Sequence, residues 1–493
     1  MSTKEALTQE VLENYIATIG LEVHAQLSTQ RKSFAPEGYQ YGNPPNTTTS
    51  PVSLGHPGTL PVPNLGHFEM AAKMGMALSC DIHKTTWFAR KNYFYADLPK
   101  GYQISQYSTP LCSNGALTID DQNGEEKNIG ITRIHLEEDS GKSIHDMDPF
   151  YSLVDLNRAG VPLIEIVTEP DFVHPREAYN FLMEMRQIVR HLEICDGNME
   201  EGSLRCDANV SVRPKNNDEY GTKVEVKNLN SMRNVQRALE YEIQRQISLW
   251  EEGRENEVEQ ETRAFDAVNG ETTVLRSKEM AEDYRYFPEP DIPPIKLSQE
   301  YLEGIYEKMP ELPREMKKKF ISQYGLKEYD AGVLTDDKHI AFYFEELVNH
   351  GVKAKNAANW LNGPVRNWLN EYVLTIGNFP LTAEKLAGLI NLVEEDKVSF
   401  SAASQTLFPE ILQKPAADPQ EMASELNLLK VEDTDALNEW VKEALGKYPD
   451  KVEEYKNGKT GVIKLFMGEV MKMSGGKADP KQAQSLLKEK LEE

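Results

Sequence analysis

Five short stretches of the chain alternate strictly between apolar residues and residues that bind metals or phosphates. Side chains of a β-strand point to alternate faces, so a period of two places one set in the core and the other set on the opposite face. A solvent face would carry Thr, Lys, Ser and Gln in no fixed order, whereas carboxylate, imidazole, guanidinium and amide groups recur here. The pattern predicts an open sheet with one face that holds a cation and a polyanion. The stretches are 21–27, 133–139, 163–167, 204–210 and 224–227.

Composition restricts the class of protein. A chain of 493 residues usually forms two to four domains. No apolar run is long enough for a membrane span and the N-terminus lacks a signal-peptide pattern, so we expect a cytoplasmic protein. The four cysteines form no CxxC pair, which favours a reducing compartment and argues against a cysteine metal site. The net charge of −25 argues on average against nucleic acid as a partner, although a local basic patch can still bind phosphates.

The order of elements predicts an α+β domain followed by helices. Strand-like segments fill residues 13–295, and helices are expected at 65–78, 175–192 and 231–250, the last with Ser231 as N-cap. Strands and helices without a regular βαβ rhythm favour a mainly antiparallel sheet. The proline-dense stretch 288–294 predicts a boundary, and a second, softer boundary falls near 409–419. We therefore expect domains at 1–295, 296–409 and 410–493.

A divalent cation is predicted on the polar face. Glu22 and His24 lie two apart on one strand, and Glu137 and Glu165 come from similar strands. Carboxylates with a single imidazole suit Mg²⁺ or Mn²⁺, whereas zinc more often draws cysteine or more histidine. The alternative for Glu22 and His24 is an ordinary surface pair. Glu138 competes with Glu137 as a ligand, but alternation favours Glu137 and Asp139.

A polyphosphate platform is predicted beside the cation. Arg205, Asp207 and Asn209 share one strand face, with Lys227 and Asn228 on the next strand and its turn. Arginine offers a planar fork to phosphate oxygens and lysine a point charge. The alternative is a set of cross-strand salt bridges. Because no Walker loop or dinucleotide glycine pattern is present, side chains on a sheet would hold any nucleotide.

Two turns could border a substrate entrance. The segment 155–162, with Arg158, precedes the Glu165 strand, and 283–288 carries two tyrosines. The second could equally be an aromatic clasp that packs the domain edge. No Ser/His/Asp order or nucleophilic cysteine pattern occurs, and Cys206 falls on an apolar face. An enzyme of this kind would work by electrostatics and phosphoryl activation.

Long blocks of the chain resemble the B subunit of tRNA-dependent amidotransferases. The similarity runs from about residue 14 to the C-terminus, and the blocks follow the family's order. They are residues 20–24, 91–95, 98–106, 135–139, 162–171, 201–209 and 283–288.

The resemblance implies a heterotrimer with an amidase A subunit, which releases ammonia from glutamine, and a small C subunit. The B subunit would use ATP and Mg²⁺ to phosphorylate the side-chain carboxylate of Glu or Asp misacylated onto tRNA(Gln) or tRNA(Asn), and ammonia would then displace phosphate. It also implies a glutamine-synthetase-like cradle, a helical domain and a YqeY-like tail that binds tRNA.

With the strand pattern, the resemblance gives three sets of candidate site residues. The metal ligands are Glu22, His24, Glu137 and Glu165. The catalytic residues are Glu137, Arg205, Asp207 and Lys227. The nucleotide-binding residues are Arg158, Arg205, Asn209, Lys227 and Asn228.

Two departures from the family are visible. Some members hold zinc through two cysteine pairs beside the early proline-rich loop, and the matching positions here are Ala35, Glu37, Ser50 and Ser53. We therefore expect no structural zinc and a loop held by packing and prolines alone. Ala96 replaces the usual proline of a Tyr-Pro-Asp turn, which affects the rigidity of that turn only.

Two other functions fit parts of the sequence. A tRNA-binding scaffold without catalysis would tolerate loss of Glu22, His24, Glu137 or Glu165. A free-standing ligase for a small metabolite would not need the helical second half. The sequence does not tell whether Asp-tRNA(Asn), Glu-tRNA(Gln) or both are substrates.

The C-terminus reverses the charge balance of the chain. From residue 441 onward it holds eleven lysines against nine acidic residues. An apolar stripe in the 462–473 helix, made by Ile463, Phe466, Met467, Val470 and Met471, predicts a bundle face. Lysines around that stripe suit a segment that contacts phosphate, and we expect Lys472 and Lys477 to bind tRNA. The alternative is an ordinary solvated bundle face.

Overall fold

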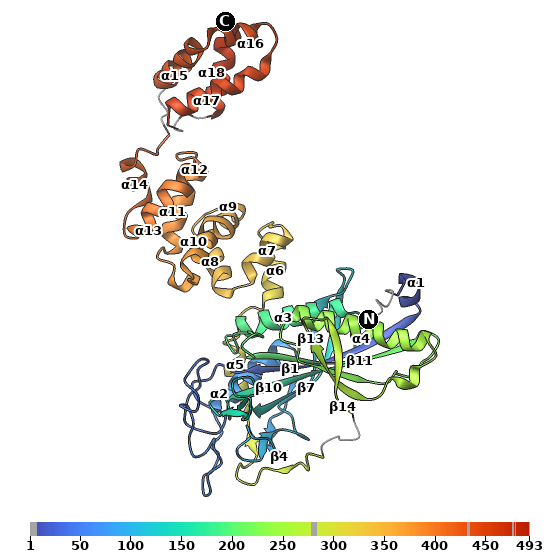
Figure 1. Cartoon of the computed structure of the whole chain (residues 1–493). Coiled ribbons are helices and arrows are strands. Elements are labelled where there is room, and N and C mark those ends of the chain that lie inside the picture. The colour runs from blue at the N-terminus through green and yellow to red at the C-terminus, as the bar shows by residue number, and fades with distance from the viewer. Residues whose placement is uncertain (1–6, 278–282, 431–433, 476–477, 479, 493) are drawn as a thin grey trace. The chain divides into compact units, whose positions relative to one another are not determined.

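The computed structural model describes residues 7–277, 283–430, 434–475, 478 and 480–492 (Figure 1). The chain divides into two compact units, Met1–Leu312 and Pro313–Glu493. We call the first unit the cradle. The predicted α+β cradle followed by an all-helical half is confirmed.

A nine-stranded sheet organises the cradle. Its strand order is β14-β13-β12-β11-β1-β10-β7-β6-β2, and every pair is antiparallel except β12 with β13. The strands are β1 (Tyr15–Gln26), β2 (Asp81–Ile82), β6 (Cys112–Asp120), β7 (Glu126–Glu138), β10 (Pro162–Thr168), β11 (Leu204–Pro214), β12 (Val224–Lys227), β13 (Glu261–Asp266) and β14 (Glu271–Ser277).

Three small sheets complete the cradle's strands. They consist of β15 (Phe287–Pro288), β4 (Ala89–Asn92) and β5 (Tyr102–Ser105); β16 (Ile295–Lys296) and β3 (Thr85–Thr86); and β8 (Lys142–Ile144) and β9 (Leu153–Asp155).

Helices cover the apolar face of the large sheet. The alternation predicted for β1 is present, because Leu21, Val23 and Ala25 are fully buried while the residues between them are partly open. These side chains share one core with α2 (Leu65–Ala77), α3 (Pro175–His191) and α4 (Met232–Glu251) (Figure 1). Each large aliphatic side chain buried there contributes on the order of 1.5–3 kcal/mol. The opposite face is left for polar side chains.

The three predicted cradle helices form at the expected places. Ser231 caps α4 by accepting a hydrogen bond from the Asn234 amide at 3.1 Å, as predicted. The cradle also contains the short helix α1 (Gln9–Leu12) and the 3₁₀ turn Glu255–Glu257.

The cradle extends past the proline-dense segment. The division between units falls after Leu312 and not after residue 295. One reason is α5 (Gln299–Tyr306), whose Leu302 and Ile305 are buried in the cradle core. The proline-dense segment itself is also tied to the cradle, because Arg90 of β4 holds Glu289 through two hydrogen bonds of 2.7 and 2.9 Å. The prolines thus cross the cradle edge before the chain leaves it.

The second unit is helical. Its first apolar cluster runs from Met316 to Ala423 and its other cluster from Leu437 to Leu491. The helices are α6 (Pro313–Ser322), α7 (Glu328–Thr335), α8 (Lys338–Asn349), α9 (Ala354–Trp360), α10 (Arg366–Tyr372), α11 (Ala383–Glu394), α12 (Phe400–Ala402), α13 (Phe408–Gln413), α14 (Pro419–Glu425), α15 (Thr434–Lys447), α16 (Pro449–Lys456), α17 (Ile463–Met473) and α18 (Pro480–Glu492). Short π-helical segments lie at Leu361–Val365 and Ala403–Leu407, and short 3₁₀ segments at Ile376–Asn378 and Thr460–Val462.

The expected boundary at 409/410 falls inside α13. Ile411 of α13 and Met422 and Ala423 of α14 belong to the first helical cluster. The predicted stripe of α17 packs into the other cluster, with Phe466 and Val470 fully buried. Among the helices that the structure describes, none is both long and apolar enough to cross a membrane.

Candidate active site

The register of the large sheet brings the predicted residues into rows. Arg205 on β11, His24 on β1, Glu165 on β10 and His135 on β7 are successive cross-strand partners. Side chains of directly paired residues on one face stand about 5 Å apart. Glu137 lies two residues beyond His135 on the same face of β7. These five side chains, from four strands, therefore lie close together on one face of the sheet.

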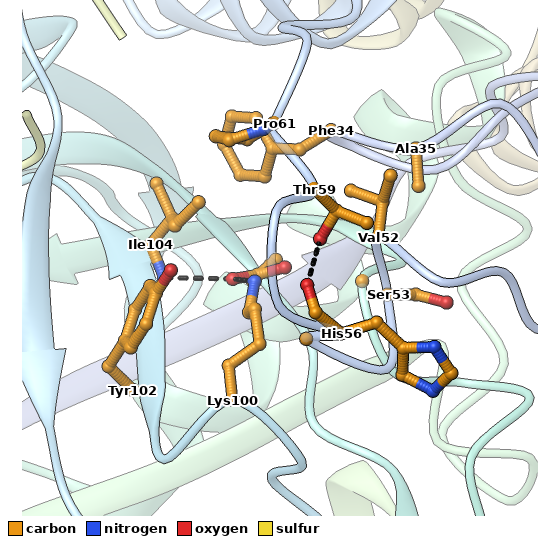
Figure 2. Close-up of a pocket in the computed structure, with 13 residues that line it drawn as sticks. Phe34, Ala35, Val52, Ser53, His56, Thr59, Pro61, Lys100, Tyr102 and Ile104 are labelled. Carbon is orange, nitrogen blue, oxygen red and sulfur yellow. Dashed lines mark hydrogen bonds and ion pairs between the residues drawn. The ribbon is translucent and has the colours of Figure 1, made fainter. Parts of the chain in front are cut away.

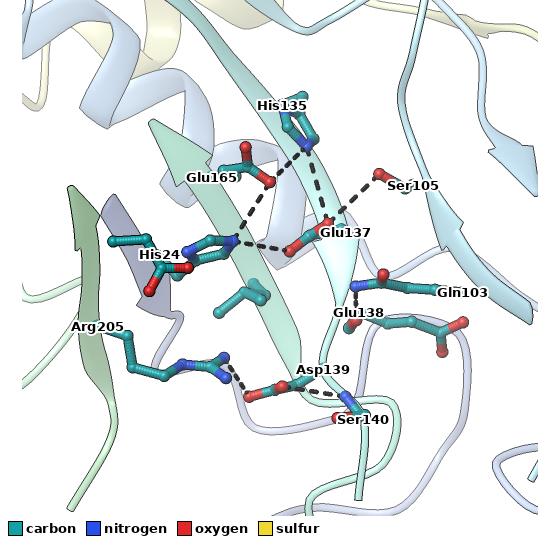
Figure 3. A network of polar contacts seen from close by, with 12 residues as sticks. His24, Gln103, Ser105, His135, Glu137, Glu138, Asp139, Ser140, Glu165 and Arg205 are labelled. Carbon is teal, nitrogen blue, oxygen red and sulfur yellow. Dashed lines mark hydrogen bonds and ion pairs between the residues drawn. The ribbon is translucent and has the colours of Figure 1, made fainter. Parts of the chain in front are cut away.

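His24, Glu137 and Glu165 form a compact group (Figure 3). Nε2 of His24 lies 3.5 Å from Oε1 of Glu137 and 3.3 Å from Oε2 of Glu165. One ligand atom from each of the three residues lies within 4.8 Å of the others. Both carboxylates are buried and the imidazole is partly open, as befits a site that a solvated ion can enter.

Mutual attraction shifts the pKa values of this group. Burial disfavours the charged form of each residue, but the charges and hydrogen bonds between them prevail. The pKa of Glu165 lies well below its usual value because of the two histidines. Glu165 and Glu137 raise the pKa of His24 and bring that of His135 to about 9. Two carboxylates this close favour a positive charge beside them, and the raised pKa values of the two histidines reflect this.

The predicted phosphate platform lies on the β1 and β11 side of this group. Nη2 of Arg205 donates to Oδ2 of Asp139 at 2.7 Å, and Nε2 of Gln26 donates to the same oxygen at 2.7 Å. Nε of Arg205 is buried and has no hydrogen-bond partner among the described residues. A buried guanidinium N–H without an acceptor is costly, so this atom is available to a ligand oxygen.

Lys227 lies on β12, the strand next to the Arg205 strand β11. Its Nζ lies 2.5 Å from Oδ2 of Asp207 and 3.0 Å from Oε1 of Glu225. Burial opposes the charge on Lys227, but these two carboxylates raise its pKa. The salt bridges that the sequence offered as an alternative are therefore present. They leave Lys227 a third donor for a ligand.

Except for Gln26, these groups line one cavity of about 650 Å³. That volume is within the range of ligand sites and suits a nucleotide with part of a second substrate. Carboxylates, basic residues and the two histidines His24 and His135 share the wall. The carboxylates are Glu22, Glu137, Asp139, Glu165, Asp207 and Glu225, and the basic residues are Lys91, Arg133, Arg205 and Lys227.

Three predicted residues are placed differently from the expectation: Glu22, Arg158, and Asn209, which lines a neighbouring cavity instead. Glu22 lines the cavity but is not within the 4.8 Å group, because it pairs across the sheet with Asp207 and accepts a hydrogen bond from Asn209 at 2.9 Å. Burial, followed by the charge of Glu165, raises the pKa of Glu22. Arg158 is not in the cavity wall, because it donates to the carbonyl oxygens of Ser140 and Gly141.

Asn228 lines the cavity wall, whereas Glu138 faces away from the cavity. Asn228 lines the cavity from the turn after β12, with a φ of 65°, and its side chain donates to the Phe265 carbonyl at 3.0 Å. Glu138 points to the other side of β7, where it contacts Lys100 and accepts from the Ile104 amide at 2.9 Å. Alternation therefore identified Glu137 and Asp139 correctly as the residues on the cavity side.

Sequence reasoning gave no role to several wall residues. His135 was visible in the alternation, and its Nε2 lies 3.2 Å from Oε2 of Glu165. Lys91 belongs to a strand of four residues, which is too short for a readable period. The tyrosines Tyr284 and Tyr286 do line the cavity, so the aromatic segment 283–288 is both a clasp and part of the site.

The early proline-rich loop contributes a second, smaller cavity of about 160 Å³ (Figure 2). Ala35 and Ser53, two of the four positions that the sequence resemblance matched to zinc-binding cysteines, line it together with Lys100 and Glu138. Polar contacts also hold this loop, contrary to the expectation of packing and prolines alone. Nζ of the fully buried Lys32 donates to the Thr48 carbonyl at 2.8 Å and lies 3.3 Å from Glu37.

The turn at Ala96 is closed by a backbone hydrogen bond, with alanine in place of the usual proline. The amide of Leu98 donates to the carbonyl of Tyr95 at 3.1 Å, which closes the turn.

Comparison with known proteins identifies the family. The model of the GatB/GatE catalytic domain matches residues 17–303, and the model of the GatB domain matches residues 342–491. The chain belongs to the GatB family. The metal-ligand group and the phosphate platform both fall within the first match, so the cavity lies in the catalytic domain of this GatB-family chain.

Curated relatives match over nearly the whole length. A protein of Alkalilimnicola ehrlichii is 48% identical over 475 residues, which cover 96% of this chain and 98% of the relative. One of Thermosynechococcus vestitus is 47% identical over 486 residues, covering 97% and 96%. One of Chlorobium limicola is 47% identical over 479 residues, covering 97% and 99%. Each is named as the B subunit of an aspartyl/glutamyl-tRNA(Asn/Gln) amidotransferase.

Proposed function

We propose that the chain is the B subunit of a tRNA-dependent amidotransferase, a ligase that converts misacylated Glu-tRNA(Gln), Asp-tRNA(Asn) or both into Gln-tRNA(Gln) and Asn-tRNA(Asn). Relatives that carry this name share nearly half of its residues along almost the full chain. One structural observation carries the proposal. A metal-ligand group and a pair of basic side chains share one cavity on a single sheet face.

The chemistry needs an activated carboxylate. In the proposed reaction a side-chain carboxylate oxygen of the aminoacyl group attacks the γ-phosphorus of ATP, and ADP leaves. Ammonia then attacks the carbonyl carbon of the acyl phosphate, and phosphate leaves. The cavity suits this route because it offers donors for phosphate oxygens. Cys206, which is fully buried, has a pKa held well above its usual value by burial.

Arg205 and Lys227 would contact the phosphates of ATP. The unpartnered Nε of Arg205 and the third donor of Lys227 can each reach an oxygen while Asp139 and Asp207 hold the side chains in place. Preorganised donors of this kind stabilise the charge of a phosphoryl transition state without reorganising during the reaction. Asp139 and Asp207 thus act as positioning residues in this proposal.

The donor set of His24, Glu137 and Glu165 fits Mg²⁺. Two carboxylates and one imidazole within 4.8 Å are hard, oxygen-rich ligands of the kind that this ion accepts. When bound, Mg²⁺ would neutralise charge on the phosphate oxygens. Glu22 would face the same ion from its neighbouring position and, with Asn209, hold water or a nucleotide oxygen.

Relatives named as one subunit of an amidotransferase imply partner subunits. We propose an amidase A subunit that supplies ammonia and a small C subunit, in a cytoplasmic heterotrimer. The lysine-rich C-terminal segment, by which we mean the chain after residue 430, would bind tRNA, and Lys472 is exposed at the end of its helix α17. Lys477 lies outside the described residues, so its assignment rests on the sequence alone.

Transamidation by the reconstituted complex tests this function. The complex is given glutamine, ATP, Mg²⁺ and either Glu-tRNA(Gln) or Asp-tRNA(Asn). We expect amide formation with at least one of them, and ATP hydrolysis that requires the misacylated tRNA. ATP hydrolysis with free glutamate would favour a metabolite ligase, and tRNA binding without ATP hydrolysis would favour a scaffold. Either result would overturn the proposal.

A further inference from the structure

Lys91 lies in the part of the cavity wall that β4 and the tyrosine segment, residues 283–288, form. Its Nζ is 5.0 Å from the ring centre of Tyr284 and 6.0 Å from that of Tyr93. The ring of Tyr286, which also lines the cavity, stacks on Tyr107 with centres 4.3 Å apart. Aromatic faces attract an ammonium group but offer it no hydrogen-bond acceptor.

The tyrosine segment is fixed to β4, so this wall is built and not a chance contact. The backbone N–H of Asn92 donates to the Tyr284 carbonyl at 3.0 Å, and its side chain donates to the Arg285 carbonyl at 2.9 Å. Arg285 adopts a φ of 45°, which is uncommon for a residue other than glycine. Lys91 and Tyr284 are therefore held together from both segments.

The ammonium of Lys91 differs from the other lysine of the cavity. Lys227 makes ion pairs of 2.5 and 3.0 Å with two carboxylates. Within the described part of the chain, Lys91 has no carboxylate within ion-pair distance and no hydrogen-bond acceptor. Burial opposes its charge, but Glu137 and Tyr286 raise the pKa of Lys91. A charged amine in a half-buried wall with free donors is a ready site for an anionic oxygen.

Lys91 and the phosphate platform stand on different sides of the metal-ligand group. The platform belongs to β11 and β12, beyond β1. Lys91 belongs to β4, whose partner β5 contacts the far edge of the group through Ser105, with its Oγ 3.4 Å from Oε2 of Glu137. A reaction that joins a phosphate to a carboxylate needs one anion on each side of the cation. The geometry supplies an unpaired donor on each side.

We propose that Lys91 binds the side-chain carboxylate of the aminoacyl group, and that this contact lets the site distinguish the acidic substrate from the amide product. The inference deepens the proposed function and rests on it. An ammonium gains far more from a carboxylate than from a neutral amide oxygen, because the first contact is a charge-assisted hydrogen bond. Loss of this contact would favour release of the product once the amide has formed.

Binding measurements on the complete complex test this role. The probes are tRNA(Gln) carrying Glu or Gln through a stable 3′-amide link, uncharged tRNA(Gln) and a non-hydrolysable ATP analogue. The wild-type complex should bind the Glu-charged tRNA more tightly than the Gln-charged one. Lys91→Met should reduce the ratio of the two affinities, for Glu-charged over Gln-charged tRNA, at least about tenfold. Affinity for uncharged tRNA and for the ATP analogue should stay unchanged.

Matched variants separate charge from folding. Lys91→Arg should keep part of the ratio, because it retains a cation over the tyrosine ring. Tyr284→Phe should keep the ratio and Tyr284→Leu should lower it, since only the second removes the ring that positions the ammonium. Lys73→Met removes a lysine that pairs with Glu69 on the surface of α2, and it should leave the ratio at the wild-type value.

Three results would overturn the inference. The first is an equal preference for Glu-charged tRNA in the wild-type and Lys91→Met complexes. The second is a fall in ATP-analogue affinity as large as the fall in the ratio, which would make Lys91 a phosphate ligand. The third is loss of the preference in Arg133→Met and not in Lys91→Met, since Arg133 is another cation of the cavity wall that makes no ion pair with a described residue. Transamidation by the wild-type complex is scored separately, so its failure would refute the proposed function instead.

Discussion

His24 on β1 and Glu165 on β10 are direct cross-strand partners, and Nε2 of the imidazole lies 3.3 Å from a carboxylate oxygen. Glu137 approaches the same nitrogen at 3.5 Å from the next strand. A ligand pair fixed by strand register needs no loop closure to form. The metal site should therefore be present before substrates bind.

Removing one ligand should abolish metal binding and activation. Glu137→Gln keeps the shape of the side chain but loses its charge. We expect Mn²⁺ affinity to fall by at least about a hundredfold, because even outer-sphere changes cost ten- to a hundredfold. ATP-dependent amidation should vanish while glutamine hydrolysis by the amidase partner proceeds. The matched control is Glu138→Gln, whose carboxylate faces Lys100, and Mn²⁺ titration followed by electron paramagnetic resonance measures both. Equal losses in the two variants would contradict the assignment.

The metal-free cradle should lose stability at high pH. The neighbouring Glu165 and Glu137 raise the pKa of buried His135 from 6.5 to about 9. Because the folded-state value is the higher one, the stabilisation is complete below pH 6.5 and disappears as the pH rises through 9. The loss should be on the order of 2–3 kcal/mol. Denaturant unfolding in EDTA at pH 6.5 and pH 9.5 measures it.

Histidine variants identify the source of that loss. His135→Asn should reduce the difference between the two pH values, whereas His83→Asn, on an exposed side chain, should leave it unchanged. A pH difference that survives in His135→Asn would assign it to another group.

Arg205 should act in the phosphoryl step without supporting the fold. Its side chain is 35% exposed and its Nε lacks a partner in the described residues. Arg205→Ala should slow ATP-dependent amidation roughly a hundredfold, the usual effect of removing one preorganised donor. The circular dichroism spectrum and the KM for tRNA should be unchanged. Arg254→Ala, an exposed control, should have the wild-type rate, and normal turnover in Arg205→Ala would refute its role.

The C-terminal segment after residue 430 should contribute tRNA affinity. Truncation after residue 430 spares the first helical cluster, which a cut at 410 would damage by removing Ile411, Met422 and Ala423. The truncated complex should bind tRNA more weakly and show a higher KM for misacylated tRNA. Lys472→Glu should reproduce part of this loss, and more so at low salt, where phosphate contacts count most. Lys353→Glu, a charge reversal on the exposed lysine that precedes α9, is the control. Unchanged tRNA binding after truncation would make the segment structural.

Sequence periodicity predicted the face of each site residue but not its neighbours. Alternation placed His24, Glu137, Glu165 and Arg205 on one face because each strand's apolar half had to be buried. Neighbours depend on register between strands far apart in the chain, which periodicity does not contain. Register pairs Glu22 with Asp207, and so the expected fourth ligand lies outside the compact group.

Other features of the site depend on long-range contacts. Lys91 is positioned by Tyr284, which reaches β4 through Asn92, and no local pattern reports such a contact. The cradle ends at Leu312 and not at residue 295, because Leu302 of α5 is buried in its core. The prolines before α5 suggest an earlier boundary, and the local sequence does not report this packing. The helical second half was predictable, since its apolar stripes have the helical period over long stretches.

The central claim is that the cavity of the cradle activates a side-chain carboxylate by phosphorylation. The most direct test follows oxygen. Glu-tRNA(Gln) labelled with ¹⁸O at both side-chain carboxylate oxygens is amidated by the reconstituted complex with unlabelled ATP, and the released phosphate is analysed by mass spectrometry. The account predicts one ¹⁸O in each phosphate and one retained in the Gln amide. Phosphate without ¹⁸O, formed together with Gln-tRNA(Gln), would contradict it.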